Sequence, residues 1–225
     1  MSLVTHHLSP RWSLLVFDLD GTLIDSRADL AAAVNHVLRG FALPELPLEV
    51  ISSYVGDGAR MLVQRALGAA HSALHDEGLR RFLEFYGAHL LERTHAYPGV
   101  TDLLAILSSH GVRQAVLSNK PEGMSRAILD GLGLSSHFVA VLGGDSLPVR
   151  KPDPAGVKHL CALTGTPAEH VLLVGDAPVD LRTAEAAGIA FCGVTWGFAA
   201  AALRAAAPAR LVDTPAELLA ALAAS

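Results

Sequence analysis

The chain has 225 residues and a formal net charge of −5, and its lysines and arginines are scattered rather than clustered. This length supports one substantial core, or a core domain carrying a smaller insertion. The acidic balance excludes a basic footprint for nucleic acid or anionic membranes. The two cysteines lie far apart, and residues 1–12 lack the pattern of a secretory signal, so we expect a cytoplasmic protein without disulfides.

A short apolar segment, residues 13–17, is predicted to be a strand, and it runs directly into the acidic sequence Asp18-Leu-Asp-Gly-Thr-Leu-Ile-Asp25. From Ser26 the apolar residues follow helical spacing, with Ser26 placed as the helix N-cap. Residues 26–94 contain further helical stretches and no convincing strand. We therefore expect these residues to form a helical cap that is inserted after the first strand.

Strand and helix patterns alternate from residue 95 to residue 225, which is typical of a parallel sheet covered on both faces. The expected strands are 113–117, 138–142, 171–174, 190–194 and 211–212, and the expected helices include 101–109, 153–163 and 215–223. Residues 1–25 and 95–225 supply all of these strands. The sequence therefore predicts an α/β core domain built from both segments.

Polar residues follow four of the predicted strands. They are Asp18 with Asp20, Ser118 with Asn119, Lys151, and Asp176. In open α/β sheets the ligand binds at the carboxyl ends of the strands, so these groups should meet in one crevice. Each of them also has an ordinary explanation as a turn residue, a helix cap or a loop charge. Their matching positions favour a shared site.

The residue types indicate phosphoryl chemistry. Asp18, nearest the strand, is predicted to be a carboxylate nucleophile that forms an aspartyl phosphate. This attack brings two anions together and therefore needs a hard cation such as Mg²⁺. Asp18, Asp176 and the carbonyl of Asp20 are its expected ligands, and Asp180, one helical turn after Asp176, is expected to join or orient that shell.

The remaining polar groups have separate expected roles. Ser118 and the amides near Pro121 offer donors to phosphate oxygens, and Lys151 supplies a positive charge against the charge that develops during transfer. Asp20 is placed to protonate the leaving alkoxide and then to deprotonate the attacking water. The predicted reaction is the hydrolysis of a phosphate ester.

Four segments, in this order, resemble the motifs of the haloacid dehalogenase superfamily. They are Asp18-Leu-Asp-Gly-Thr22, Leu117-Ser-Asn119, Lys151-Pro152, and Gly175-Asp176 with Asp180. The resemblance covers essentially the whole chain, and it implies a Rossmann-like parallel sheet with a mobile cap, Mg²⁺ and a phosphoaspartate. Asp20 resembles the acid of the phosphatases rather than the dehalogenase branch.

Further segments resemble phosphoglycolate phosphatases. They are Asp25-Ser-Arg-Ala-Asp-Leu30, Val55-Gly-Asp-Gly58, Ser118-Asn-Lys-Pro121 and Thr195-Trp-Gly197. The chain departs from the usual pattern in having Ala177-Pro178 after Gly175-Asp176, and Ser118 where Thr is commoner. The resemblance implies 2-phosphoglycolate as the substrate, with pyrophosphate, sugar phosphates and nucleotides as alternatives.

The cap is expected to contribute to substrate binding. Gly56 and Gly58 either form a flexible turn or bring backbone amides over the active site, where Arg60 or Arg65 would meet a substrate carboxylate and Asn119 would add a contact from the core. A phospho-accepting regulatory module is the alternative from another class, but it needs neither Asp20 nor the insertion. We expect an enzyme, either a monomer or a homodimer, whose partner is a small phosphorylated metabolite.

Overall fold

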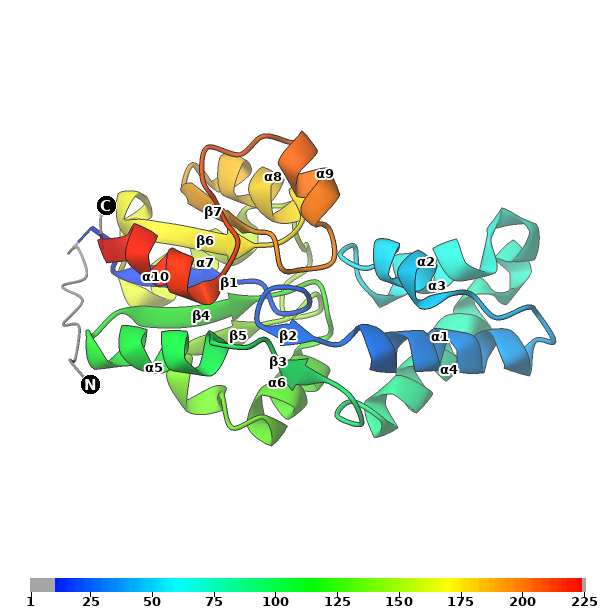
Figure 1. Cartoon of the computed structure of the whole chain (residues 1–225). Helices are drawn as coiled ribbons and strands as arrows, with labels where there is room; N and C mark the ends of the chain where they lie inside the picture. The colour runs from blue at the N-terminus through cyan, green and yellow to red at the C-terminus, as the bar shows by residue number, and fades with distance from the viewer. Residues whose placement is uncertain (1–10, 224–225) are drawn as a thin grey trace.

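A computed structural model describes residues 11–223, and its core is a six-stranded sheet in the order β5-β4-β1-β6-β7-β8 (Figure 1). The strands are β1 (Leu14–Phe17), β4 (Arg113–Leu117), β5 (Ala140–Leu142), β6 (Val171–Gly175), β7 (Ala190–Val194) and β8 (Leu211–Val212). All of the pairings are parallel. The predicted α/β parallel sheet is therefore confirmed, although the strand expected from residue 138 begins at Ala140.

The central strand is apolar on both of its faces. The four residues of β1 are at most 1% exposed, because Leu15 and Phe17 pack into one hydrophobic cluster and Leu14 and Val16 into another. A continuous apolar run is the usual composition of a parallel strand that is covered on both sides. Burial of β1 between β4 and β6 carries the residues that follow all three strands to the same edge of the sheet.

Helices cover both faces of the sheet. One hydrophobic cluster includes α5 (Val100–Ser109), α6 (Glu122–Gly131) and α10 (Pro215–Ala223), and the other includes α7 (Ala155–Thr164) and α8 (Pro178–Ala187). The short helix α9 (Ala200–Ala205) follows β7, and 3-10 turns at Ser135–His137 and Ala168–His170 precede β5 and β6. No helix within residues 11–223 is long and apolar enough to cross a membrane.

A second group of helices lies beyond one end of the sheet (Figure 1). It consists of α1 (Arg27–Gly40), α2 (Leu48–Ser53), α3 (Ala59–Leu67), a 3-10 turn (Ala69–Leu74) and α4 (His75–Ala88). Their apolar faces form a hydrophobic cluster of their own, with Phe82 and Tyr86 among its largest buried side chains. We call these helices and their connections, residues 26–94, the cap.

The chain leaves and re-enters the core through a small antiparallel pair, β2 (Ile24–Asp25) and β3 (His95–Ala96). Both strands are too short to have produced a strand pattern in the sequence. Beside them, the buried Asp29 of α1 accepts hydrogen bonds from the backbone N–H and the hydroxyl of Thr94, at 2.8 and 2.7 Å. These hydrogen bonds therefore join the segment that enters the cap to the segment that leaves it.

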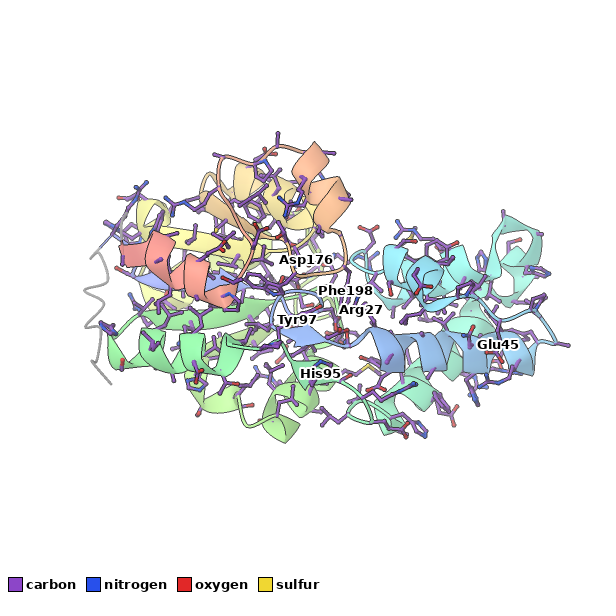
Figure 2. All side chains as sticks on the ribbon, viewed as in Figure 1. Arg27, Glu45, His95, Tyr97, Asp176 and Phe198 are labelled. Carbon is purple, nitrogen blue, oxygen red and sulfur yellow. The ribbon has the colours of Figure 1, made fainter. Side chains whose placement is uncertain are left out.

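A second contact joins the base of the cap to the core. Arg27, the first residue of α1, donates to Asp25, and its guanidinium lies 5.5 Å from the centroid of the Phe198 ring. Figure 2 shows Arg27 and Phe198 between the sheet domain and the cap, next to Asp176, while Glu45 lies at the far end of the cap. The start of the cap therefore rests against the loop that follows β7.

Candidate active site

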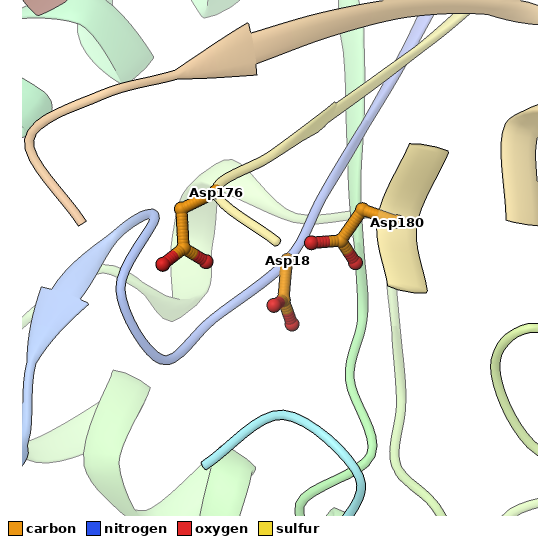
Figure 3. Close-up of side chains that lie close together, drawn as sticks. All are labelled: Asp18, Asp176 and Asp180. Atoms are coloured by element: carbon orange, nitrogen blue, oxygen red, sulfur yellow. The ribbon is translucent and has the colours of Figure 1, made fainter. Parts of the chain in front are cut away.

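Three buried aspartates meet at the carboxyl edge of the sheet. Asp18 follows β1, Asp176 follows β6, and Asp180 lies in the first turn of α8. One carboxylate oxygen from each lies within 4.8 Å of the others, and none of the three residues is more than 6% exposed. Figure 3 shows the three carboxylates around a common space. The predicted convergence of strand-end carboxylates is present in the structure.

The electrostatics of this cluster favour a cation. Burial raises the pKa of Asp18 to about 6, with Lys151 opposing the shift and Asp180 adding to it. Burial also raises the pKa of Asp176 to about 8, and repulsion from Asp18 and Asp180 contributes. Buried carboxylates that repel each other are stabilised by a nearby positive charge. Oxygen ligands of this kind suit a hard divalent ion, so the residues present fit Mg²⁺.

Lys151 supplies one positive charge to the cluster. Its Nζ donates to Asp180 Oδ1 at 2.6 Å and lies 2.8 Å from Asp18 Oδ1. Burial alone lowers the pKa of Lys151, but the two carboxylates outweigh that effect and hold the pKa above its ordinary value. Lys151 is therefore a fixed cation. Asp18 Oδ1, which contacts Lys151, also accepts a hydrogen bond from the backbone N–H of Leu19 at 2.7 Å.

Asp176 is held in place by close backbone contacts. A Cβ on Gly21, whose φ is +85°, would lie 2.3 Å from Asp176 Oδ2, and a Cβ on Gly197 would lie 2.4 Å from the same oxygen. Oδ2 also accepts the N–H of Phe198 at 2.7 Å and, more weakly, that of Ala199 at 3.3 Å. The Gly of the Asp18-to-Thr22 motif and the Gly of Thr195-Trp-Gly197 thus both pack against one carboxylate.

Asp180 is oriented by the backbone at the start of α8. The N–H of Ala177 donates to Asp180 Oδ2 at 3.1 Å, and a Cβ on Gly175 would lie 2.4 Å from the same carboxyl group. Ala177 stands where similar sequences more usually have Ser or Thr, so this position has no side-chain hydroxyl to orient a ligand. In the structure a backbone amide orients Asp180 at this position.

Asp20 has one carboxylate oxygen anchored. Its Oδ1 accepts the hydroxyl of Ser26 at 2.5 Å and the ammonium of Lys120 at 2.6 Å. The prediction that Ser26 caps α1 through its side chain is wrong, because this hydroxyl makes no capping hydrogen bond and points to Asp20 instead. A side chain that could cap a helix is also free to bond a neighbouring carboxylate, and the sequence does not distinguish the two.

Lys120 is the site residue that sequence reasoning missed. Its side chain is 4% exposed, and its Nζ lies 4.9 Å from the ring centroid of Tyr86, which comes from α4 of the cap. Burial lowers its pKa, but the Asp20 carboxylate and Tyr86 more than compensate and keep the pKa above the ordinary lysine value. The sequence did contain one indication of its role, because Lys120 lies two residues after Ser118 in the polar segment that follows β4.

A pocket of about 40 Å³ lies between this edge of the core and the cap. Its lining includes Asp18, Asp20, Ser118, Asn119 and Lys120 from the core and Val55, Gly56, Gly58, Leu62, Phe82 and Tyr86 from the cap. Most of the cap side is apolar. The structure therefore brings the predicted glycines to the same pocket as the strand-end polar groups.

Asn119 connects core and cap within this pocket. Its Nδ2 donates to the carbonyl of Gly56 at 2.9 Å and to the carbonyl of Lys151 at 3.1 Å, and its Oδ1 is buried without a partner among the described residues. Sequence reasoning expected Asn119 to contact substrate. The structure shows it fastening the cap loop to the core.

Arg60 does not line the pocket. Its guanidinium is half exposed and pairs with Asp76 of α4 at 2.7 Å. Arg65, the other arginine of α3, pairs with Asp57 at 2.5 Å and donates to the carbonyl of Tyr54. Both arginines serve contacts within the cap in this structure.

The fold and the site place the chain in a known class of hydrolases. Residues 15–194 match the family model described as "Haloacid dehalogenase-like hydrolase", and the chain belongs to this family. It is 42% identical over 191 residues to a phosphoglycolate phosphatase of Pseudomonas fluorescens, covering 82% of this chain and 70% of that protein. It is 41% identical over 189 residues to a phosphoglycolate phosphatase of Neisseria gonorrhoeae, covering 82% and 80%.

Solved structures agree with this assignment. A predicted phosphoglycolate phosphatase from Haemophilus somnus superposes with a TM-score of 0.88 at 33% identity, covering 94% of this chain and 98% of the other. A haloacid dehalogenase-like hydrolase from Bacteroides fragilis superposes with a TM-score of 0.85 at 24% identity, which shows a shared fold. The likeness includes core and cap together.

Proposed function

We propose that this protein is a Mg²⁺-dependent phosphatase that hydrolyses 2-phosphoglycolate through a phosphoaspartate on Asp18. The observation that carries the proposal is that Asp18 and Asp20, each with one oxygen held by different donors, line one pocket beside a buried cluster of aspartates. Membership of the hydrolase family and the names of the relatives support the reaction class.

Asp18 is suited to attack phosphorus. Lys151 and the Leu19 N–H both contact Oδ1, and Oδ2 has no protein hydrogen-bond donor among residues 11–223. Oδ2 attacks the phosphorus, the bond to the ester oxygen breaks, and the phosphoryl group is transferred to the aspartate. Ser118 and Lys151 stabilise the charge that develops on the transferring group.

Asp20 is suited to move the proton. Ser26 and Lys120 fix its Oδ1, and its carboxyl group lines the pocket, so Oδ2 can reach the leaving oxygen. Asp20 protonates the leaving alkoxide as the ester bond breaks. It then takes a proton from the water that attacks the phosphoaspartate, and inorganic phosphate and free Asp18 are released.

Mg²⁺ would be held by the carboxylates of Asp18, Asp176 and Asp180, with the carbonyl of Asp20 as a further expected ligand. When bound, it supplies positive charge that offsets the repulsion between carboxylate and phosphate. The surrounding backbone orients these ligands. Gly21 and Gly197 pack against Asp176, and the Ala177 amide donates to Asp180.

The size of the pocket supports a small substrate. A buried water needs about 10–15 Å³ in the same measure, so about 40 Å³ corresponds to about three or four water molecules. A two-carbon organic group fits this space better than a hexose or a nucleoside. The cap over the pocket would also exclude bulk water during transfer.

The test measures phosphate release by the purified chain with 2-phosphoglycolate, pyrophosphate, a hexose phosphate and a nucleoside monophosphate. We expect the highest kcat/KM with 2-phosphoglycolate, loss of activity with EDTA and recovery with Mg²⁺. In the same buffer, Mg²⁺ at 100 times its Kd should raise the free energy of unfolding by about 2.7 kcal/mol, and Tm should rise accordingly. A preference for another phosphomonoester would refute the substrate, and metal-independent turnover would refute the mechanism.

A further inference from the structure

The pocket contains one charged side chain that the hydrolytic steps above use only as an anchor. Lys120 hydrogen-bonds Asp20 Oδ1 at 2.6 Å, and this contact occupies one of the three donors of an ammonium group. Its side chain is 4% exposed, yet its residue lines the pocket together with Asp18 and Ser118. A buried ammonium beside a substrate pocket has the capacity to bind a second acceptor.

The position of Lys120 follows from its contact with Asp20. A general acid must lie about 2.6–3.2 Å from the leaving oxygen. Lys120 Nζ lies 2.6 Å from Oδ1 of this carboxylate, and Oδ2, which contacts the leaving oxygen, lies about 2.2 Å from Oδ1, so the leaving oxygen lies within about 8 Å of Nζ. In a phosphorylated 2-hydroxy acid the carboxylate carbon is two bonds from the leaving oxygen, or about 2.4 Å. A carboxylate turned toward Lys120 can therefore accept a hydrogen bond from its ammonium when the leaving oxygen lies within about 6 Å of Nζ, while Asp20 contacts that oxygen.

Besides Lys120, the described residues that line the pocket include no lysine or arginine, and the guanidinium of Arg150 lies beside the lining residue Gly58 without lining the pocket itself. Arg60 and Arg65, the cap residues best placed in sequence for a carboxylate, pair with Asp76 and Asp57 outside it. A carboxylated substrate without Lys120 would face Asp18 and Asp20 with no compensating charge on the leaving-group side.

We propose that Lys120 is a specificity-determining residue that binds a carboxylate on the leaving group. The enzyme therefore selects phosphorylated short 2-hydroxy acids over neutral phosphomonoesters of the same size. This inference rests on the proposed phosphatase function and goes beyond it by assigning the recognition of the organic group to one side chain of the core. The ammonium of Lys120 then donates hydrogen bonds both to Asp20 and to the substrate carboxylate.

The experiment compares 2-phosphoglycolate with 2-hydroxyethyl phosphate, in which CH₂OH replaces the carboxylate. We expect wild type to favour 2-phosphoglycolate in kcat/KM by about 10- to 100-fold, the range for one hydrogen bond to a charged group. In Lys120→Met, activity falls on both substrates because Asp20 loses its anchor, but the preference collapses toward one. The matched control is Lys158→Met, an exposed lysine on α7, which should keep the wild-type preference.

The outcomes separate this inference from the proposed function. If Lys120→Met loses activity equally on both substrates and keeps the preference, Lys120 only orients Asp20 and the inference is wrong. If wild type hydrolyses both esters without preference, the phosphatase stands and the inference is again wrong. If wild type hydrolyses neither, the proposed function itself fails. If Lys120→Met does not fold, Lys120→Arg decides. It keeps the cation, so a retained preference with a raised KM supports the inference, and a lost preference overturns it.

Discussion

The two sides of the pocket differ in chemistry. The core side carries two carboxylates, a lysine and a hydroxyl, and each of the two aspartates has one oxygen fixed by named donors. The cap side is largely apolar, with Leu62 and Phe82 packed in the cap's own hydrophobic cluster and Gly56 contributing backbone. We therefore expect the core to perform the reaction and the cap to set the volume in which it occurs.

The two sides also differ in how substitutions should act. On the core side, the backbone at Gly21 and Gly197 lies so close to Asp176 that an added Cβ at either position would clash with it, so small displacements there change the reacting groups. One of the contacts that join the cap to the core, the hydrogen bond from Asn119 to the carbonyl of Gly56, lies in the pocket itself. Changes in the core should therefore reduce kcat, and changes at the junction should alter KM as well.

The largest effect is expected from Asp18→Asn. The amide keeps the shape of the side chain but is no nucleophile, so kcat should fall by about four orders of magnitude or more. Steady-state kinetics with Mg²⁺ measure this loss, and circular dichroism checks the fold. Asp102→Asn, on the exposed face of α5, is the matched control and should retain activity. Turnover by Asp18→Asn at a wild-type rate would exclude the phosphoaspartate route.

A smaller but still large effect is expected from Gly197→Ala. The added Cβ would lie 2.2 Å from the Gly21 carbonyl oxygen and 2.4 Å from Asp176, so the carboxylate must move. Displacing a group that orients a metal ligand typically costs about 10–100-fold in affinity or activity. A Mg²⁺ titration of activity should show the raised metal requirement.

The control for this substitution is Gly123→Ala. Gly123 lies in α6 with open space around its Cβ position, and alanine there should stabilise the helix by about 0.5–1 kcal/mol without changing the Mg²⁺ dependence. An unchanged Mg²⁺ requirement in Gly197→Ala would show that the loop after β7 does not position Asp176.

An intermediate effect is expected at the junction between core and cap. Asn119→Ala removes the donors to Gly56 and Lys151, so the cap loop loses its attachment and kcat/KM should fall by about 10-fold with a raised KM. Asn35→Ala is matched, since Asn35 makes two hydrogen bonds to the backbone of Leu46 within the cap. It should lower Tm but leave KM near wild type, and equal changes in KM for both variants would argue against the attachment.

The parts of the site that sequence reasoning predicted share one physical cause. Asp18, Ser118 and Asp176 each follow a strand whose apolar run fixes its end, and parallel strands bring their carboxyl ends to one edge. Lys151 was predicted from its position beyond the strand expected at 138–142, and Asp180, an expected metal ligand, from its spacing of one helical turn after Asp176. The alternation of strands and helices likewise predicted the sheet, because the apolar runs are long enough to identify buried strands.

The parts that were missed depend on contacts between distant or competing groups. Lys120 meets Asp20, 100 residues earlier, and nothing local in the sequence indicates that pair. Ser26 has a side chain equally able to cap α1 or to bond Asp20, and only the folded chain selects the second. The two-residue strands β2 and β3 are too short to carry a pattern and exist because the cap must leave and return at one place.

The smallest effect is expected from Arg60→Ala, which tests whether the cap side contributes a charge to binding. Arg60 was a reasonable sequence candidate for a substrate carboxylate, but its guanidinium pairs with Asp76, whose side chain is 88% exposed, and it lies outside the pocket lining. Exposed ion pairs are worth about 0–1 kcal/mol, so Tm and the kcat/KM for 2-phosphoglycolate should stay close to wild type. Thermal melting and steady-state kinetics measure both. A raised KM for 2-phosphoglycolate but not for 2-hydroxyethyl phosphate would mean that Arg60 swings into the pocket when the cap closes. The cap would then take part in recognising the carboxylate rather than only limiting the volume.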